Sequence, residues 1–163
     1  MTTTKLTRRA VLAGASAATL GACALPGGGD PPQLYTLTPK STFAADLPRA
    51  ASYMERAAKQ DLLEAMIDFA VMLFNGQGTP KDETRAAALF RRAALRGNPL
   101  AMNRYARLLA AGRGTRPDAQ KAAQWHMTAH MLGASDAWLQ EFVKNMDPVQ
   151  REAAESGARD WLR

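Results

Sequence analysis

Apolar and small residues recur along the chain in two long blocks that are related by a shift of 36 positions. Residues 62–74 form an apolar-rich run without proline or glycine, long enough for about three helical turns. A glycine-containing break follows at 76–78, and a second run with spaced alanines continues to Gly97. The same order of run, break and run returns between residues 101 and 133. The pattern predicts two copies of a helix–turn–helix unit.

The identities between the two copies fall where small size or turn geometry matters. The Gly-x-Gly breaks permit a backbone with positive φ, so the chain can reverse direction there. An aspartate before each second helix is placed to accept hydrogen bonds from the first N–H groups of that helix. Paired alanines allow close helix packing, and a further glycine ends each second helix. We expect the repeat signature to consist of Gly76, Gly78, Asp82, Ala86, Gly97, Gly112, Gly114, Asp118, Ala122 and Gly133.

The segment from Phe69 to Gly97 resembles a Sel1-like repeat, which belongs to the wider group of tetratricopeptide-type α-solenoids. The Gly-x-Gly turn, the aspartate and the alanine pairs all fall in the register of that family. The second copy departs from it at His126 and His130, where an aromatic and a small residue are usual. The resemblance implies an all-α fold, a short α-solenoid of about seven antiparallel helices. It also implies scaffolding or protein recognition as the mode of action.

Composition and the repeat register together suggest the domain boundaries. We expect a removable signal peptide at 1–22 and a flexible tether at 23–46, which is rich in glycine and proline. The repeat domain then covers 47–163. Within it we expect a degenerate half-repeat at 48–64, full repeats at 65–100 and 101–136, and C-terminal capping helices at 137–163.

The first 24 residues have the organisation of an export signal. Lys5, Arg8 and Arg9 form a basic start, and an uncharged run from Ala10 to Ala22 follows. That run is too short to span a bilayer comfortably and has the size of a signal-peptide core. The arginine pair lies in a segment that resembles a twin-arginine signal, and general secretory export is the alternative.

The uncharged run ends in Leu20-Gly21-Ala22-Cys23, which is similar to a bacterial lipobox. Cys23 is the only cysteine, so an internal disulfide is impossible and acylation of its thiol would give it a role. Cleavage after Ala24, with Cys23 incidental, is the alternative. We therefore expect an outer-membrane lipoprotein that faces the periplasm, with a soluble periplasmic protein as the alternative.

Charge gives little support to a nucleic-acid partner. The formal net charge of +6 falls to +3 once the basic residues of the predicted signal are removed. The remaining basic residues are scattered among acidic ones, which is typical of a solvated helical surface.

The best candidates for chemistry are His126 and His130, which lie four residues apart on one helical face and could share a metal ion. No glutamate, cysteine or third histidine stands at ligand spacing, so packed histidines are the favoured interpretation. A metal-dependent hydrolase that uses this pair is an alternative. The sequence contains no nucleophile motif, phosphate-binding loop or acid pair that stands out. We expect no enzyme, no cofactor, no resident metal and no small-molecule substrate.

The first helix of each repeat is expected, from the resemblance, to line the concave surface. The candidates for contact with an unidentified envelope protein are Asp68, Met72, Arg104, Arg107 and Leu108. Residues 35–37 (Tyr-Thr-Leu) look like the start of transport-auxiliary lipoproteins. An auxiliary component of a lipid or solute transporter is therefore a second alternative.

Overall fold

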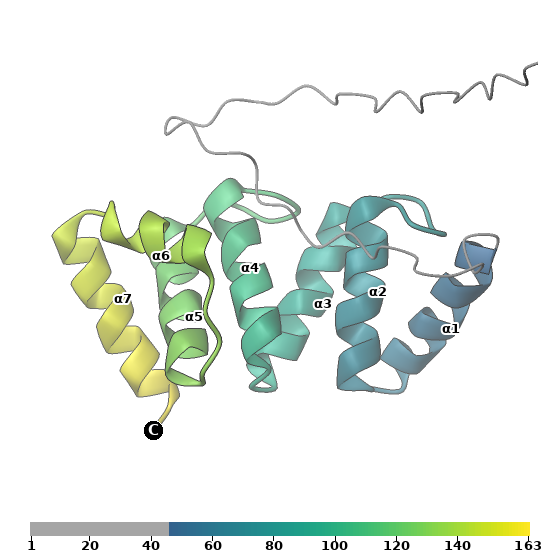
Figure 1. Cartoon of the computed structure of the whole chain (residues 1–163), viewed down its shortest axis with the longest axis horizontal. Coiled ribbons are helices and arrows are strands. Elements are labelled where there is room, and N and C mark those ends of the chain that lie inside the picture. Colours follow the sequence, from purple (N-terminus) through teal and green to yellow (C-terminus); the bar gives the residue numbers. More distant parts are fainter. Residues whose placement is uncertain (1–45) are drawn as a thin grey trace, which may run out of the picture. The chain divides into compact units, whose positions relative to one another are not determined.

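The computed structural model describes residues 46–163, and the regular structure among them is entirely helical (Figure 1). The predicted signal peptide, Cys23 and the tether up to residue 45 lie outside these residues. The described part holds seven helices, which confirms the prediction of an all-α solenoid. They are α1 (Leu47–Lys59), α2 (Leu63–Asn75), α3 (Glu83–Leu95), α4 (Pro99–Ala111), α5 (Ala119–Met131), α6 (Ala137–Lys144) and α7 (Pro148–Trp161).

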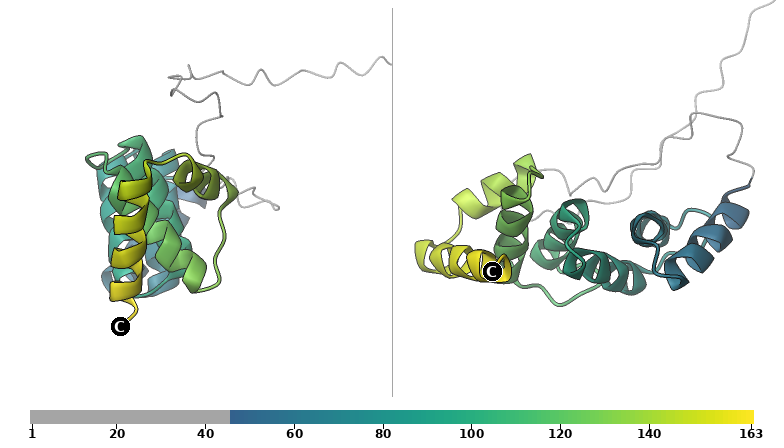
Figure 2. Two further views of the ribbon diagram at one scale, coloured as in Figure 1. Left: turned by 90° about the vertical axis from the view of Figure 1, so that its left-hand side faces the viewer. Right: turned by 90° about the horizontal axis from the view of Figure 1, so that it is seen from below.

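Consecutive helices lie side by side and reverse direction at each turn (Figures 1 and 2). From α1 to α5, each helix packs against the next one along the chain. We call α2 and α4 the first helices of the two repeats, and α1, α3 and α5 the second helices. The first helices lie between second helices, and nine of the 13 residues of α2 are buried. The core is therefore continuous through the array, from Ala51 to Ala129.

Local turn chemistry sets the ends of these helices. α2 and α4 end at Gly76 and Gly112, whose φ values of 70° and 64° lie in the left-handed region. A side chain in that conformation costs about 1–2 kcal/mol, which glycine avoids. α3 and α5 begin after Asp82 and Asp118, and each carboxylate accepts a 2.9 Å hydrogen bond from a backbone N–H three residues on.

The second glycine of each turn lets successive repeats approach each other. A Cβ atom at Gly78 would overlap the backbone carbonyl of Leu47 at the start of α1. A Cβ atom at Gly114 would overlap the carbonyl of Glu83 at the start of α3 in the same way. Because both pairs are related by the 36-residue period, the same backbone contact joins each turn to the preceding second helix.

The C-terminal helices depart from this regular stacking. α6 has eight residues, whereas α1 to α5 have 13 each. α7 packs directly on α5, and the Trp161 ring lies edge-on to the Trp125 ring with 6.0 Å between centroids. Figure 2 shows α6 displaced to one side of this pair. Among residues 46–163, none of the helices has the length and apolar character needed to cross a bilayer.

Candidate functional site

The structure buries three of the five side chains predicted to contact a partner. Met72 and Leu108 are 3% and 1% exposed and belong to the core, and Arg104 is 7% exposed. The prediction that these side chains lie on an accessible surface is therefore wrong. The reason is that α2 and α4 each pack against a second helix on both sides, which leaves only a narrow strip of each first helix exposed.

Asp68 is the one exposed member of the predicted set, and it lies near Arg104. The guanidinium of Arg104 on α4 is 5.9 Å from the centroid of the Phe90 ring on α3. Neighbouring protein atoms desolvate the Asp68 carboxyl and raise its pKa above the ordinary value. The positive charge of Arg104 opposes this shift, and the negative charge of Glu64 adds to it.

Arg107, the fifth predicted residue, connects two helices. Its Nε and Nη2 atoms each lie 2.7 Å from an oxygen of Asp136, so the ion pair is bidentate. The two side chains are only 19% and 12% exposed. Asp136 also accepts a hydrogen bond from the N–H of Leu139 and so caps α6. Arg107 therefore attaches α4 to the start of α6, and a charge reversal there would set two carboxylates against each other.

These contacts determine the ionisation of Asp136. Burial acts to raise the pKa of its carboxyl. The hydrogen bonds from Arg107 and from the Leu139 N–H outweigh burial, so the pKa of Asp136 lies below its usual value. The carboxylate is charged at neutral pH and the ion pair is fully formed.

His126 is a buried histidine with a buried hydrogen-bond partner. It is 4% exposed, and its Nδ1 lies 2.9 Å from Oδ1 of Asn103. Assigned as a donor, Nδ1–H satisfies this amide oxygen. Burial lowers the pKa of His126 below the ordinary value, while the charge of Asp136 acts in the opposite direction. The exposed His130 ring stacks beside it, with 6.3 Å between the centroids.

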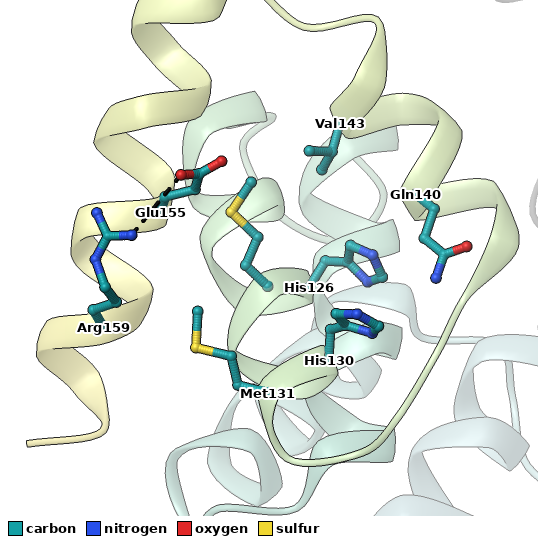
Figure 3. A pocket seen from close by; sticks show the side chains of 8 residues that line it. His126, His130, Met131, Gln140, Val143, Glu155 and Arg159 are labelled. Atoms are coloured by element: carbon teal, nitrogen blue, oxygen red, sulfur yellow. Dashed lines mark ion pairs between the residues drawn. The ribbon is translucent and has the colours of Figure 1, made fainter.

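The histidine pair opens onto a pocket of about 340 Å³ between α5, α6 and α7 (Figure 3). In that view the imidazoles of His126 and His130 point toward Gln140, while Met131 lies on the side of Glu155 and Arg159. Among residues 46–163, no group of three or more His, Cys, Asp or Glu could hold a metal ion. Glu155 also lines the pocket, but it does not form such a group with the two imidazoles.

Sequence reasoning singled out the two histidines and missed the rest of the pocket wall. Gln140, Glu155 and Arg159 come from helices whose packing on α5 breaks the 36-residue register. No periodic signal could have placed them there. The pocket is a product of the irregular C-terminal end.

Comparisons with known proteins agree with this architecture. The model of the Sel1 repeat family matches residues 42–62, 63–98 and 99–126. The crystal structure of a protective antigen present in uropathogenic Escherichia coli strains, which displays an SLR fold, is similar with a TM-score of 0.64 and 24% sequence identity over 71% of this chain. A Sel1 repeat protein from Oxalobacter formigenes is similar with a TM-score of 0.55 and 21% identity over 69% of this chain.

The chain spans only part of these two proteins, because the similarities cover 25% of the first and 50% of the second. No functionally curated protein is significantly similar in sequence.

Proposed function

Because the chain belongs to the Sel1 repeat family, we propose that it is a binding protein whose helical array recognises another protein in the bacterial cell envelope. The observation that carries this proposal is that each of the second helices α1, α3 and α5 exposes a row of side chains. Apolar side chains such as Tyr53 and Leu95 are exposed there among charged residues. Repeat arrays bind partners on the extended surfaces that their stacked helices create.

The binding surface lies on the second helices rather than on the first. The first helices are mostly buried, so they present few side chains to a partner. α3, in contrast, exposes residues along its whole length, from Thr84 to Leu95. Asp68 on α2 is exposed and can contact a partner at the edge of this binding surface.

Site-specific photo-crosslinking tests this function. A photoreactive amino acid is placed in the full chain at Ala88 in α3 or at Gln120 in α5, two exposed positions on second helices. The matched control is Lys144 in α6, which is also exposed. We expect Ala88 and Gln120 to give an adduct with the same defined envelope protein and Lys144 to give none. Adducts of equal yield at all three positions, or none at any, would contradict the proposal.

The envelope location rests on the N-terminal residues. We propose that residues 1–22 are removed, that Cys23 is acylated and that 23–46 links the lipid to a repeat domain at 47–163. One acyl chain alone binds a membrane only marginally, so several chains are expected on Cys23. One of the similar structures is a bacterial protective antigen, which accords with an exported protein.

Mass spectrometry of the mature protein decides between lipidation and its alternatives. We expect an N-terminal Cys23 that carries acyl chains, and a Cys23→Ser variant that is recovered in the soluble fraction. A mature N-terminus at Leu25, or an unmodified Cys23, would rule out the lipoprotein. It would leave a soluble periplasmic protein as the explanation.

Deletion of residues 33–46 addresses the transporter-auxiliary alternative. A scaffold whose helices bind the partner keeps the crosslink from Ala88 after this deletion. A protein that depends on its Tyr35-Thr36-Leu37 segment loses it. The same membrane preparation serves for both variants.

A further inference from the structure

Two grooves on the second-helix surface are built from equivalent positions of successive repeats. The first groove, of about 200 Å³, lies between α1 and α3, and the second, of about 420 Å³, lies between α3 and α5. The first is lined by, among others, Glu55, Lys59, Phe69, Arg85, Ala88 and Leu89. A shift of 36 residues gives the lining of the second groove, which is Arg91, Leu95, Tyr105, Lys121, Gln124 and Trp125.

The first groove already contains a carboxylate of the chain itself. Oε1 of Glu55 lies 3.1 Å from a guanidinium nitrogen of Arg85 and 3.2 Å from Nζ of Lys59. These hydrogen bonds, from Lys59 and from Arg85, lower the pKa of Glu55. The Arg85 guanidinium also lies 5.7 Å from the centroid of the Phe69 ring at the base of the groove. In this groove an acid of the chain itself is thus held between two cations, beside an aromatic ring.

The second groove has a cation where the first has its acid. Arg91 takes the position of Glu55, and Lys121 takes the position of Arg85. Lys121 has no acid across the groove and turns back to Asp118, the cap of its own helix, at 2.9 Å. Within residues 46–163, Arg91 forms no ion pair or side-chain hydrogen bond. Two cations therefore line one groove with no acid between them.

The base of the second groove is aromatic. The rings of Tyr105 and Trp125 meet edge to face with 6.1 Å between centroids, and Trp161 continues the row from α7. Leu95 is 53% exposed at the rim. An aromatic base with cations at its edge is suited to an acidic side chain that has an apolar neighbour.

We propose that the groove between α3 and α5 binds an acidic segment of a partner protein. A glutamate or aspartate carboxylate lies between Arg91 and Lys121, and an adjacent apolar side chain covers Tyr105 and Trp125. In the first groove, the carboxylate of Glu55 already makes the equivalent contact with Arg85. The proposal rests on the protein-recognition function proposed above and specifies the chemistry of the partner.

Fluorescence anisotropy with a defined probe tests the proposal on the full chain. The probe is a labelled, blocked nine-residue peptide that alternates Glu with Leu, and its control has Gln in place of Glu. We expect the Glu peptide to bind at least about tenfold more tightly than the Gln peptide, with an affinity that falls as salt is raised. Equal binding of the two peptides would overturn the proposal. Tighter binding of a labelled single-stranded oligonucleotide that displaces the peptide would also overturn it, because cations beside aromatic rings can bind nucleic acid as well.

One substitution gives the second groove the acid that the first groove has, and a second substitution serves as the control. Arg91→Glu places an acid opposite Lys121, as Glu55 stands opposite Arg85, and is expected to weaken peptide binding at least about tenfold without lowering Tm. Arg163→Glu makes the same change of charge at an exposed C-terminal site and is expected to alter binding by less than about twofold. Peptide binding by Arg91→Glu that equals wild type would reject the site.

The reverse exchange opens the first groove. Glu55→Arg gives it the cation pair of the second groove, and the number of peptides bound per chain is expected to rise from one to two. A ratio that stays at one would overturn the equivalence of the grooves on which the proposal depends. If the Glu peptide does not bind while the Ala88 crosslink persists, the protein-recognition function stands and this inference fails.

Discussion

The two central repeats and the C-terminal helix pair bury their apolar surface in different ways. In α2 to α5, each first helix has 13 residues, ends at a left-handed glycine and is held between two second helices. α6 has eight residues, and its connection to α7 at 145–147 contains no glycine. α7 then packs on α5.

The difference shows that apolar composition alone does not insert a helix into the array. α6 carries Trp138, Leu139 and Phe142, yet only Leu139 is fully buried. A full-length first helix and a Gly-x-Gly turn are what bring a new layer against the preceding one. In α6 both are missing, so α7 packs on α5 in its place. The pocket beside His126 is left open.

The largest contrast between the two regions should come from core aromatics. Phe90 is fully buried in α3, so Phe90→Ala is expected to lower the free energy of unfolding by about 3–5 kcal/mol. Phe142 in α6 is only partly buried and stacks on Trp138, so Phe142→Ala should cost about 1–2 kcal/mol. Urea unfolding of the full chain, followed by circular dichroism, measures both. Equal losses would mean that α6 is as integral to the core as α3.

The turns should give the next largest contrast. Gly114→Ala combines positive φ with overlap against the Glu83 carbonyl and should cost about 2–4 kcal/mol. Gly133 has a φ of 89° but no atom within 4 Å of an added Cβ, so Gly133→Ala should cost only about 1 kcal/mol. Thermal melts of the two variants test the order. If Gly133→Ala were the more destabilising, backbone strain would outweigh the contact between repeats.

The ion pair that joins the regions should have a smaller effect. Asp136→Asn leaves Arg107 without its carboxylate partner and is expected to cost about 2 kcal/mol, below the range for fully buried pairs because both side chains are partly exposed. Glu141→Gln removes an exposed pair with Lys144 and should have no measurable effect on Tm. Matching Tm values for the two variants would show that Arg107 does not fasten α6.

The smallest effect should appear in the pH dependence of the same pair. A carboxyl whose pKa is lower in the folded state stabilises the protein above its ordinary pKa of about 3.9, and this stabilisation is lost as pH falls through the folded value. The difference in unfolding free energy between wild type and Asp136→Asn should therefore be constant near neutrality and shrink below about pH 4. Urea titrations at a series of pH values measure it. A difference that grows on acidification would contradict the assigned shift.

The regular part of the fold was predictable because its determinants are local. A glycine that needs positive φ, or an aspartate that caps a helix, acts within a few residues, so its spacing marks the helix ends directly in the sequence. The 36-residue identity between the repeats adds that successive units pack alike. These features predicted the all-α solenoid.

The candidate site was harder to predict because burial depends on neighbours that the pattern does not identify. Asp68 and Arg104 hold the same repeat position, yet one is exposed and the other buried. α4 contacts α6 in addition to α3 and α5, whereas the described neighbours of α2 are α1 and α3. The sequence alone shows that Arg91 occupies the repeat position of Glu55. That this exchange changes the charge of a groove follows only from the structure, in which both positions line equivalent grooves.

The backbone contact of the second turn glycine has a consequence for how such a chain can change in length. Gly78 with Leu47 and Gly114 with Glu83 are the same interface displaced by 36 residues. A tandem duplication of one 36-residue stretch would therefore carry both halves of that interface, wherever within the period the breakpoint fell. The added layer would meet complementary surfaces on both sides without any further substitution. Unequal recombination can thus lengthen or shorten the array in whole layers, and each gained layer brings one more groove whose charges are free to diverge.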